Sequence, residues 1–121
     1  MSQYEKGTPE LIQALQAAVP GRGSVDGDIN DDFSHDEMPI YGKAMPEVVA
    51  ECLTTEEVAA VMKLCNENRV PVTPRGAGTG LTGGAVAIHG GVVLSTTKMN
   101  KILSYDTENM VVRVQAGVLL N

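Results

Sequence analysis

Apolar residues recur at helical spacing near the start of the chain. They are Leu11, Ile12, Leu15, Ala18 and Val19, which fall on one face of a helix over residues 9–19. Thr8 is a suitable capping residue, and Pro9 occupies the first helical position that proline favours. The proline and glycines of residues 20–23 end this helix, and residues 24–45 are polar enough to predict a loop.

A second amphipathic helix is predicted to begin at residue 55 and to end near residues 66–68. Thr54 and Glu57 have the spacing of a capping box at its start. Its apolar face consists of Val58, Val61, Met62 and Cys65, which follow one another at helical spacing. This helix therefore has one side to bury and one side to expose.

Shorter apolar runs predict strands on both sides of the second helix. They cover residues 48–53, 70–73, 91–96, 102–105 and 110–116. The first two enclose the helix in a β-α-β unit, for which a right-handed crossover and a parallel strand pair are expected. The turn residues 106–109 predict a hairpin between the last two. Because no helix separates the later strands, the predicted fold class is α+β.

Composition favours a globular protein and argues against nucleic-acid-binding and membrane-spanning proteins. A length of 121 residues suits one domain, and a hydrophobic fraction of 43% is that of an average globular protein. The net charge of -6, with no basic patch, argues against nucleic acid as a partner. No apolar run reaches the length of about 18 residues that a transmembrane segment needs. With no secretory signal at the start, we expect a cytoplasmic protein.

Neither a metal site nor a catalytic side chain stands out. Asp26, Asp28, Asn30 and Glu37 imitate a calcium-binding loop, but Asp31 stands where such a loop needs glycine. The two histidines lack the spacing of metal ligands, and the two cysteines lack the CxxC spacing of metal and redox motifs. We predict no metal, no catalytic residue in this chain and two buried thiols.

Glycines are concentrated in one part of the chain. Seven lie within 16 residues: Gly76, Gly78, Gly80, Gly83, Gly84, Gly90 and Gly91. The loop at residues 74–84 follows a predicted strand directly, and its successive backbone N–H groups can form a nest for an anion. Thr79 and Thr82 add hydroxyl donors, and Arg75 adds a positive charge. We predict a phosphate or pyrophosphate site rather than a flexible connector.

The type of phosphate loop can be narrowed further. Residues 78–83 fit the pattern G-x-G-x-x-G, but a dinucleotide loop of that kind must open a helix. No helix of useful length fits residues 84–91, and Ala85 and Val86 stand where a Walker A loop needs Lys and Ser or Thr. The loop is therefore predicted to bind through its own backbone. On this view Gly78→Val abolishes binding, because a branched side chain blocks close approach.

From residue 45 to residue 118 the chain resembles the N-terminal part of the FAD-linked oxidase family with the vanillyl-alcohol-oxidase (PCMH-type) flavin fold. The resemblance is carried by VPVTPRGAGTGLTGG at residues 70–84, supported by residues 90–95, 99–103 and 114–118 in the family's order. It is nearest to the branch of D-lactate dehydrogenase and the glycolate oxidase large subunit. Two positions depart from the family's pattern: Ala116 replaces a proline, and His35 replaces a tyrosine.

The resemblance implies FAD as the cofactor, with its pyrophosphate along the glycine loop. It assigns to the cofactor Arg75, Gly76, Ala77, Gly78, Thr79, Gly80, Leu81, Thr82, Gly83 and Gly117. It also implies hydride transfer to FAD from a small 2-hydroxy acid of the D-lactate or glycolate type, with the base in a later substrate domain. Iron–sulfur or electron-transfer flavoprotein subunits are the implied protein partners, and a peripheral position at the inner face of the membrane is the alternative location.

The expected organisation has two parts. Residues 1–44 form an N-terminal helix and acidic loop, and residues 45–121 form the first lobe of a PCMH-type FAD-binding domain. Because the family's domains extend further, we expect a fragment that is not catalytic alone. Two alternatives remain, namely a nucleotide-binding module without turnover and an interaction domain in which the glycine loop is only a connector.

Overall fold

The elements of the fold follow the apolar pattern closely. A computed structural model describes residues 6–25, 29–34, 44–80 and 83–119. In chain order the elements are α1 (Pro9–Ala18), β1 (Gly23–Val25), the 3₁₀ helix η2 (Asp31–Ser34), β2 (Val48–Glu51), α2 (Thr55–Glu67), β3 (Val72–Arg75), β4 (Val92–Ser95), β5 (Ile102–Asp106) and β6 (Val111–Val114). Both predicted helices, the predicted strands and the hairpin are confirmed, although β3 lies two residues later than the strand predicted at residues 70–73. Within the described residues of the predicted loop, β1 and η2 were not predicted, because each is short and contains a single apolar residue.

Four strands form the main sheet in the order β1-β2-β4-β3. Strands β2, β4 and β3 are parallel, and β1 is antiparallel to β2. The β-α-β unit thus has parallel strands as predicted, but β4 lies between them, so the expectation of a direct pair was wrong. The physical reason is that β4 is buried along its whole length, whereas β3 carries Pro74, which lacks a backbone donor and suits an edge.

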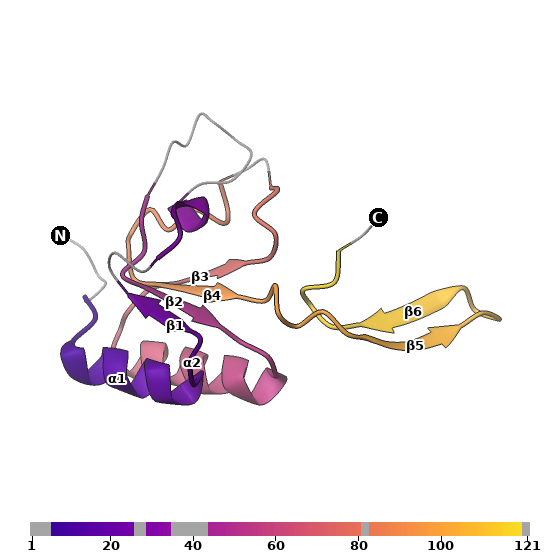
Figure 1. The fold of residues 1–121 in the computed structure, drawn as a ribbon, viewed down its shortest axis with the longest axis horizontal. Coiled ribbons are helices and arrows are strands. Elements are labelled where there is room, and N and C mark those ends of the chain that lie inside the picture. The colour runs from indigo at the N-terminus through magenta and orange to yellow at the C-terminus, as the bar shows by residue number, and fades with distance from the viewer. Residues whose placement is uncertain (1–5, 26–28, 35–43, 81–82, 120–121) are drawn as a thin grey trace.

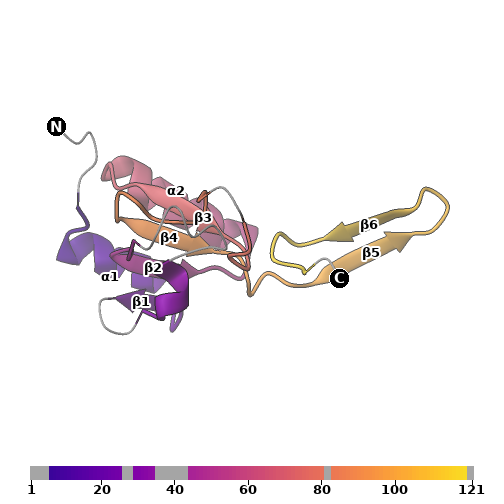
Figure 2. The ribbon, with the colours of Figure 1, turned by 90° about the horizontal axis from the view of Figure 1, so that it is seen from above.

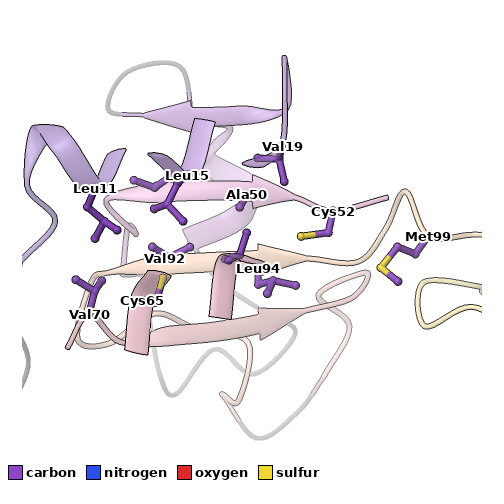
Figure 3. Close-up of a cluster of buried hydrophobic side chains, with 12 residues drawn as sticks. Leu11, Leu15, Val19, Ala50, Cys52, Cys65, Val70, Val92, Leu94 and Met99 are labelled. Atoms are coloured by element: carbon purple, nitrogen blue, oxygen red, sulfur yellow. The ribbon is translucent and has the colours of Figure 1, made fainter. Parts of the chain in front are cut away.

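The main sheet is covered on both faces. Helices α1 and α2 pack side by side on one face, while η2 and the chain before β4 lie on the other (Figure 1). Successive residues of β2 and β4 therefore enter two different cores. The helix-side core, drawn in Figure 3, contains Leu11, Leu15, Val19, Val48, Ala50, Cys52, Val61, Cys65, Val70, Val92, Leu94 and Met99. The opposite core contains Ile29, Val49, Ala87 and Val93.

Both helices begin at the predicted caps. The Thr8 hydroxyl accepts from the Leu11 N–H at 3.2 Å, and the Thr54 hydroxyl accepts from the Glu57 N–H at 3.1 Å. Both terminal nitrogens of Arg22 donate hydrogen bonds to the Glu57 carboxylate, at 2.6 and 2.7 Å. This paired hydrogen bond lowers the pKa of Glu57 to about 2 and ties α2 to the segment that follows α1.

Strands β5 and β6 form a separate two-stranded hairpin that projects from the main sheet (Figure 2). Every residue of these two strands is exposed. The hairpin reaches the main sheet through residues 96–101 and returns through residues 115–119. That return brings the end of the described chain back beside the carboxyl end of β4, where the backbone N–H of Gly117 donates to the carbonyl of Met99 at 2.8 Å.

Candidate functional site

The glycine loop leaves the main sheet where three parallel strands end together. Glu51, Arg75 and Ser95, the last residues of β2, β3 and β4, lie in register across these strands. The Thr96 N–H donates to the Arg75 carbonyl at 2.9 Å, which fixes the start of the loop against the strand beside it. Ligands of open parallel sheets bind at such carboxyl ends, where the connecting loops are free to approach them.

Two cavities flank the start of the loop. One has a volume of about 300 Å³ and is lined by Asn30, Asp32, Phe33, Glu51, Arg75, Gly76, Ala77 and Thr97. The other has a volume of about 350 Å³ and is lined by Gly76, Ala77, Thr79, Ala116, Gly117, Val118 and Leu119. The two cavities share Gly76 and Ala77, so the backbone there is accessible from both sides. Cavities of this size are in the range that small-molecule ligands occupy.

The predicted cofactor residues occupy different places around these cavities. Gly76, Ala77, Thr79 and Gly117 line the larger one together, although Gly117 is far from the others in sequence. Arg75 lines the smaller one. Gly78, Gly80 and Gly83 belong to the same loop without lining either cavity. Leu81 and Thr82 lie outside the described residues.

Gly76 has open space beside its backbone. A Cβ built there would meet no atom of the described residues within 4 Å, its chain neighbours aside. Packing among these residues therefore does not require glycine at this position, which borders both cavities. A backbone left bare beside an open cavity allows a phosphate group to reach the peptide N–H groups, which is the fit expected for the pyrophosphate of FAD.

Contacts within the protein already account for the presence of glycine at positions 78 and 117. Gly78 has a φ of 76°, and a side chain there would overlap the guanidinium of Arg75. A side chain on Gly117 would overlap the carbonyl of Thr96. Cofactor contacts at both positions stay predictions, and Gly78→Val would meet Arg75 before it met any ligand.

The glycine cluster is not a single ligand-binding loop. Gly90 and Gly91 precede β4 and therefore lie at the amino end of the parallel strands, opposite the end where the loop leaves β3. A side chain on Gly91 would overlap the carbonyl of Pro71, so close packing at the start of β4 explains that glycine. Seven glycines within 16 residues thus serve two ends of the sheet.

The chain after the loop contains no helix among the residues described. Residues 83–91 make turns, with N–H groups of Val86 and Gly90 donating to the carbonyls of Gly83 and Ala87 at 3.1 and 2.9 Å. The prediction that no helix of useful length fits residues 84–91 is confirmed. Binding through the loop's own peptide groups and hydroxyls stays a prediction.

Sequence reasoning missed the contribution of the polar N-terminal segment. Asn30, Asp32 and Phe33 line the smaller cavity, and the Asp32 carbonyl accepts from the Arg75 guanidinium at 2.6 Å. A hydrophobic Phe33 in an otherwise acidic run was the one available signal. It packs at the edge of the sheet core opposite the helices.

Among the described residues, the remaining histidine, cysteine and acidic side chains form no second site. Cys52 and Cys65 are buried and unbridged as predicted, and burial raises the pKa of each thiol to about 11. His89 is exposed, and within the described residues no group of histidine, cysteine or acidic side chains is arranged to hold a metal ion. His35 and most of the calcium-like run lie outside these residues. No helix in the described part is long and apolar enough to cross a membrane.

Comparison with known proteins agrees with this geometry. The chain is 65% identical over 119 residues to a D-lactate dehydrogenase of Anaerostipes hadrus, an alignment that covers 98% of this chain and 25% of that protein. It is 42% identical over 87 residues to the glycolate oxidase subunit GlcD of Bacillus subtilis (strain 168), covering 72% of this chain and 18% of that one. The chain thus spans about a quarter or less of these relatives.

A solved structure shares the fold. The crystal structure of p-cresol methylhydroxylase with substrate bound superposes with a TM-score of 0.77 at 29% identity, over 90% of this chain and 22% of that one. This confirms the predicted α+β, PCMH-type architecture. The boundary between residues 44 and 45 stays a prediction, although α1 shares its core with β2 and α2. Residues 46–121 match the FAD binding domain family, and the chain belongs to that family.

Proposed function

We propose that this chain forms the pyrophosphate-binding part of the FAD site of an enzyme that oxidises a 2-hydroxy acid of the D-lactate or glycolate type. The bare backbone at Gly76, open to two cavities, is the observation that carries the proposal. The 65% identity to a D-lactate dehydrogenase supports the substrate class. Iron–sulfur or electron-transfer flavoprotein partners, and the cytoplasmic location, stay predictions.

In this proposal, the residues of this chain bind and orient the cofactor. The N–H groups of Gly76, Ala77 and Thr79 and the Thr79 hydroxyl would contact the phosphates, and the segment at residues 116–119 lines the larger cavity opposite them. When bound, FAD supplies the hydride acceptor for the carbinol carbon of the substrate, whose hydroxyl proton goes to a base outside the described residues, giving a 2-oxo acid.

A chimaera tests the proposal. Residues 1–121 replace the matching quarter of the Anaerostipes hadrus D-lactate dehydrogenase, and the purified protein is examined for flavin absorbance near about 450 nm and for oxidation of D-lactate. We expect a yellow, active protein. A yellow protein without turnover would favour the nucleotide-binding alternative, and a folded protein without flavin would overturn the proposal.

A matched pair of variants tests the part played by Gly76. Gly76→Val places a branched side chain at the cavity border, where a Cβ meets no atom of the described residues, so we expect flavin content to fall more than tenfold at an unchanged melting temperature. Gly7→Val is the control, because a Cβ at this position, just before the N-cap of α1, makes only ordinary contacts at 3.7 and 3.8 Å. Full flavin content in Gly76→Val would remove this loop from the cofactor site.

A further inference from the structure

Arg75 is buried in a place where its neighbours are exposed. Its residue exposure is 6%, whereas Pro74 and Gly76 on either side are exposed. Withdrawing a guanidinium from water is costly unless its N–H groups find acceptors. The structure supplies acceptors from distant segments, since one terminal nitrogen donates to the Asp32 carbonyl at 2.6 Å and the other to the Ala85 carbonyl at 3.2 Å.

The same guanidinium also packs against two other groups. Its central carbon lies 5.7 Å from the centre of the Phe33 ring, within the range of a cation–π contact. On another side it touches the backbone of Gly78, where a side chain would overlap it. Arg75 thus joins η2, the glycine loop and the turn before β4, which are three segments far apart in the chain or irregular in structure.

We propose that Arg75 is a positioning residue of the cofactor site, which sets the conformation of the glycine loop through the Asp32 and Ala85 carbonyls, Phe33 and Gly78. This deepens the proposed function and rests on it. The competing role is a direct ion pair between Arg75 and a cofactor phosphate, for which any cation at this position would suffice. The two roles predict different results for lysine, because its ammonium is a point charge and cannot span both carbonyls in the planar geometry of a guanidinium.

The first test needs no cofactor. Hydrogen exchange is measured on this chain and on Arg75→Lys, with Arg113→Lys on the exposed hairpin as the matched control. We expect the hydrogen-bonded amides of Phe33 and Val86, which lie in the two segments that Arg75 holds, to exchange about tenfold faster in Arg75→Lys, the effect of losing roughly one buried hydrogen bond. Amides of β2 and β4 keep their rates. Unchanged exchange at both Phe33 and Val86 would overturn the proposal.

The second test uses FAD affinity in the chimaera. Arg75→Lys is expected to weaken binding about tenfold while the salt dependence of the dissociation constant stays that of the parent, since the net charge is the same. The direct phosphate contact predicts a different result. Arg75→Lys would then keep its FAD affinity, whereas Arg75→Gln would lose affinity and show a weaker salt dependence of the dissociation constant. If the parent chimaera binds no flavin, the proposed function fails and the exchange experiment still decides the role of Arg75.

A double-mutant cycle tests the contact with Gly78. Gly78→Ala is expected to weaken FAD binding about tenfold in the parent, where the new methyl meets the guanidinium, and clearly less in an Arg75→Ala background, where that space is vacated. Fully additive losses would contradict the proposal. Should the Arg75 variants fail to fold, Phe33→Leu keeps an apolar side chain against the opposite core while removing the ring beside Arg75, and it is expected to speed exchange at Val86 by a smaller factor.

Discussion

Strands β4 and β6 have similar sequences and opposite environments. The first reads VVLS and is buried along its length, and the second reads VVRV and is exposed along its length. Strand β4 lies in the middle of a sheet that helices cover on one face and loops on the other (Figure 1). Strand β6 pairs only with β5 (Figure 2). Apolar composition therefore predicts that a segment is a strand without predicting how much of it is covered.

The hairpin nevertheless has two distinct faces. Tyr105 pairs with Val112 and Ile102 pairs with Val114, and these cross-strand partners share one apolar face. The opposite face carries the Ser104–Arg113 pair and is polar. The hairpin thus has the alternation of a sheet covered on one side, whereas β2 and β4 have the continuous apolar runs of strands covered on both.

The largest expected effect compares one leucine from each region. Leu94→Ala removes a side chain that is 3% exposed and should lower the free energy of unfolding by about 2–5 kcal/mol, measured by urea denaturation. Leu103→Ala in the hairpin starts from a residue that is 55% exposed and should change it by about 0.5 kcal/mol or less. Equal losses would mean that the hairpin is covered in solution.

Thiol reactivity gives a second comparison between the covered main sheet and the exposed hairpin. At pH 8 in the folded protein, Cys52 and Cys65 should react with iodoacetamide at least about 100-fold more slowly than a free thiol, because burial blocks access and raises the pKa of each to about 11. A cysteine introduced by Ser104→Cys in the hairpin should react at the rate of a free thiol. Rapid labelling of the native cysteines would show that the helices leave the sheet readily.

Acid should destabilise the region of the two helices through the Arg22–Glu57 pair. The pKa of Glu57 is held at about 2 by Arg22, below the value of 4.5 expected in an unfolded chain. The stability from this pair is therefore complete above about pH 4.5 and is lost as the pH falls through about 2.

Glu57→Gln tests this dependence through unfolding midpoints between pH 7 and pH 2. We expect Glu57→Gln to lower stability at pH 7 by less than Leu94→Ala does. Below pH 4.5, its unfolding midpoint should fall less steeply with pH than that of the parent. Glu56→Gln in the same helical turn is the control and should leave the parent's decline in place. A parent-like decline in Glu57→Gln would assign the acid sensitivity to other carboxylates.

Sequence reasoning about the candidate site reached furthest where the residues are consecutive. The glycine loop after β3 and the absence of a helix at residues 83–91 could be derived from residues 74–91, whereas binding through the loop backbone stays a prediction. The contact of Arg75 with Asp32 could not be derived, because the two residues are 43 positions apart and a backbone carbonyl carries no sequence signal. Family resemblance assigns Gly117 to the cofactor, which also stays a prediction, and in the structure Gly117 lines the same cavity as Gly76.

The sequence by itself determined the helices with their caps, the strand segments, the hairpin turn and the position of the glycine loop, since each depends on spacing within a few residues. The tertiary structure alone decided that β4 separates β2 from β3, that Gly90 and Gly91 serve the opposite end of the sheet from Gly76, and that Arg75 is buried. These are relations between segments far apart in the chain. They depend on which surfaces can cover one another, and a local pattern of apolar and polar residues does not encode that choice.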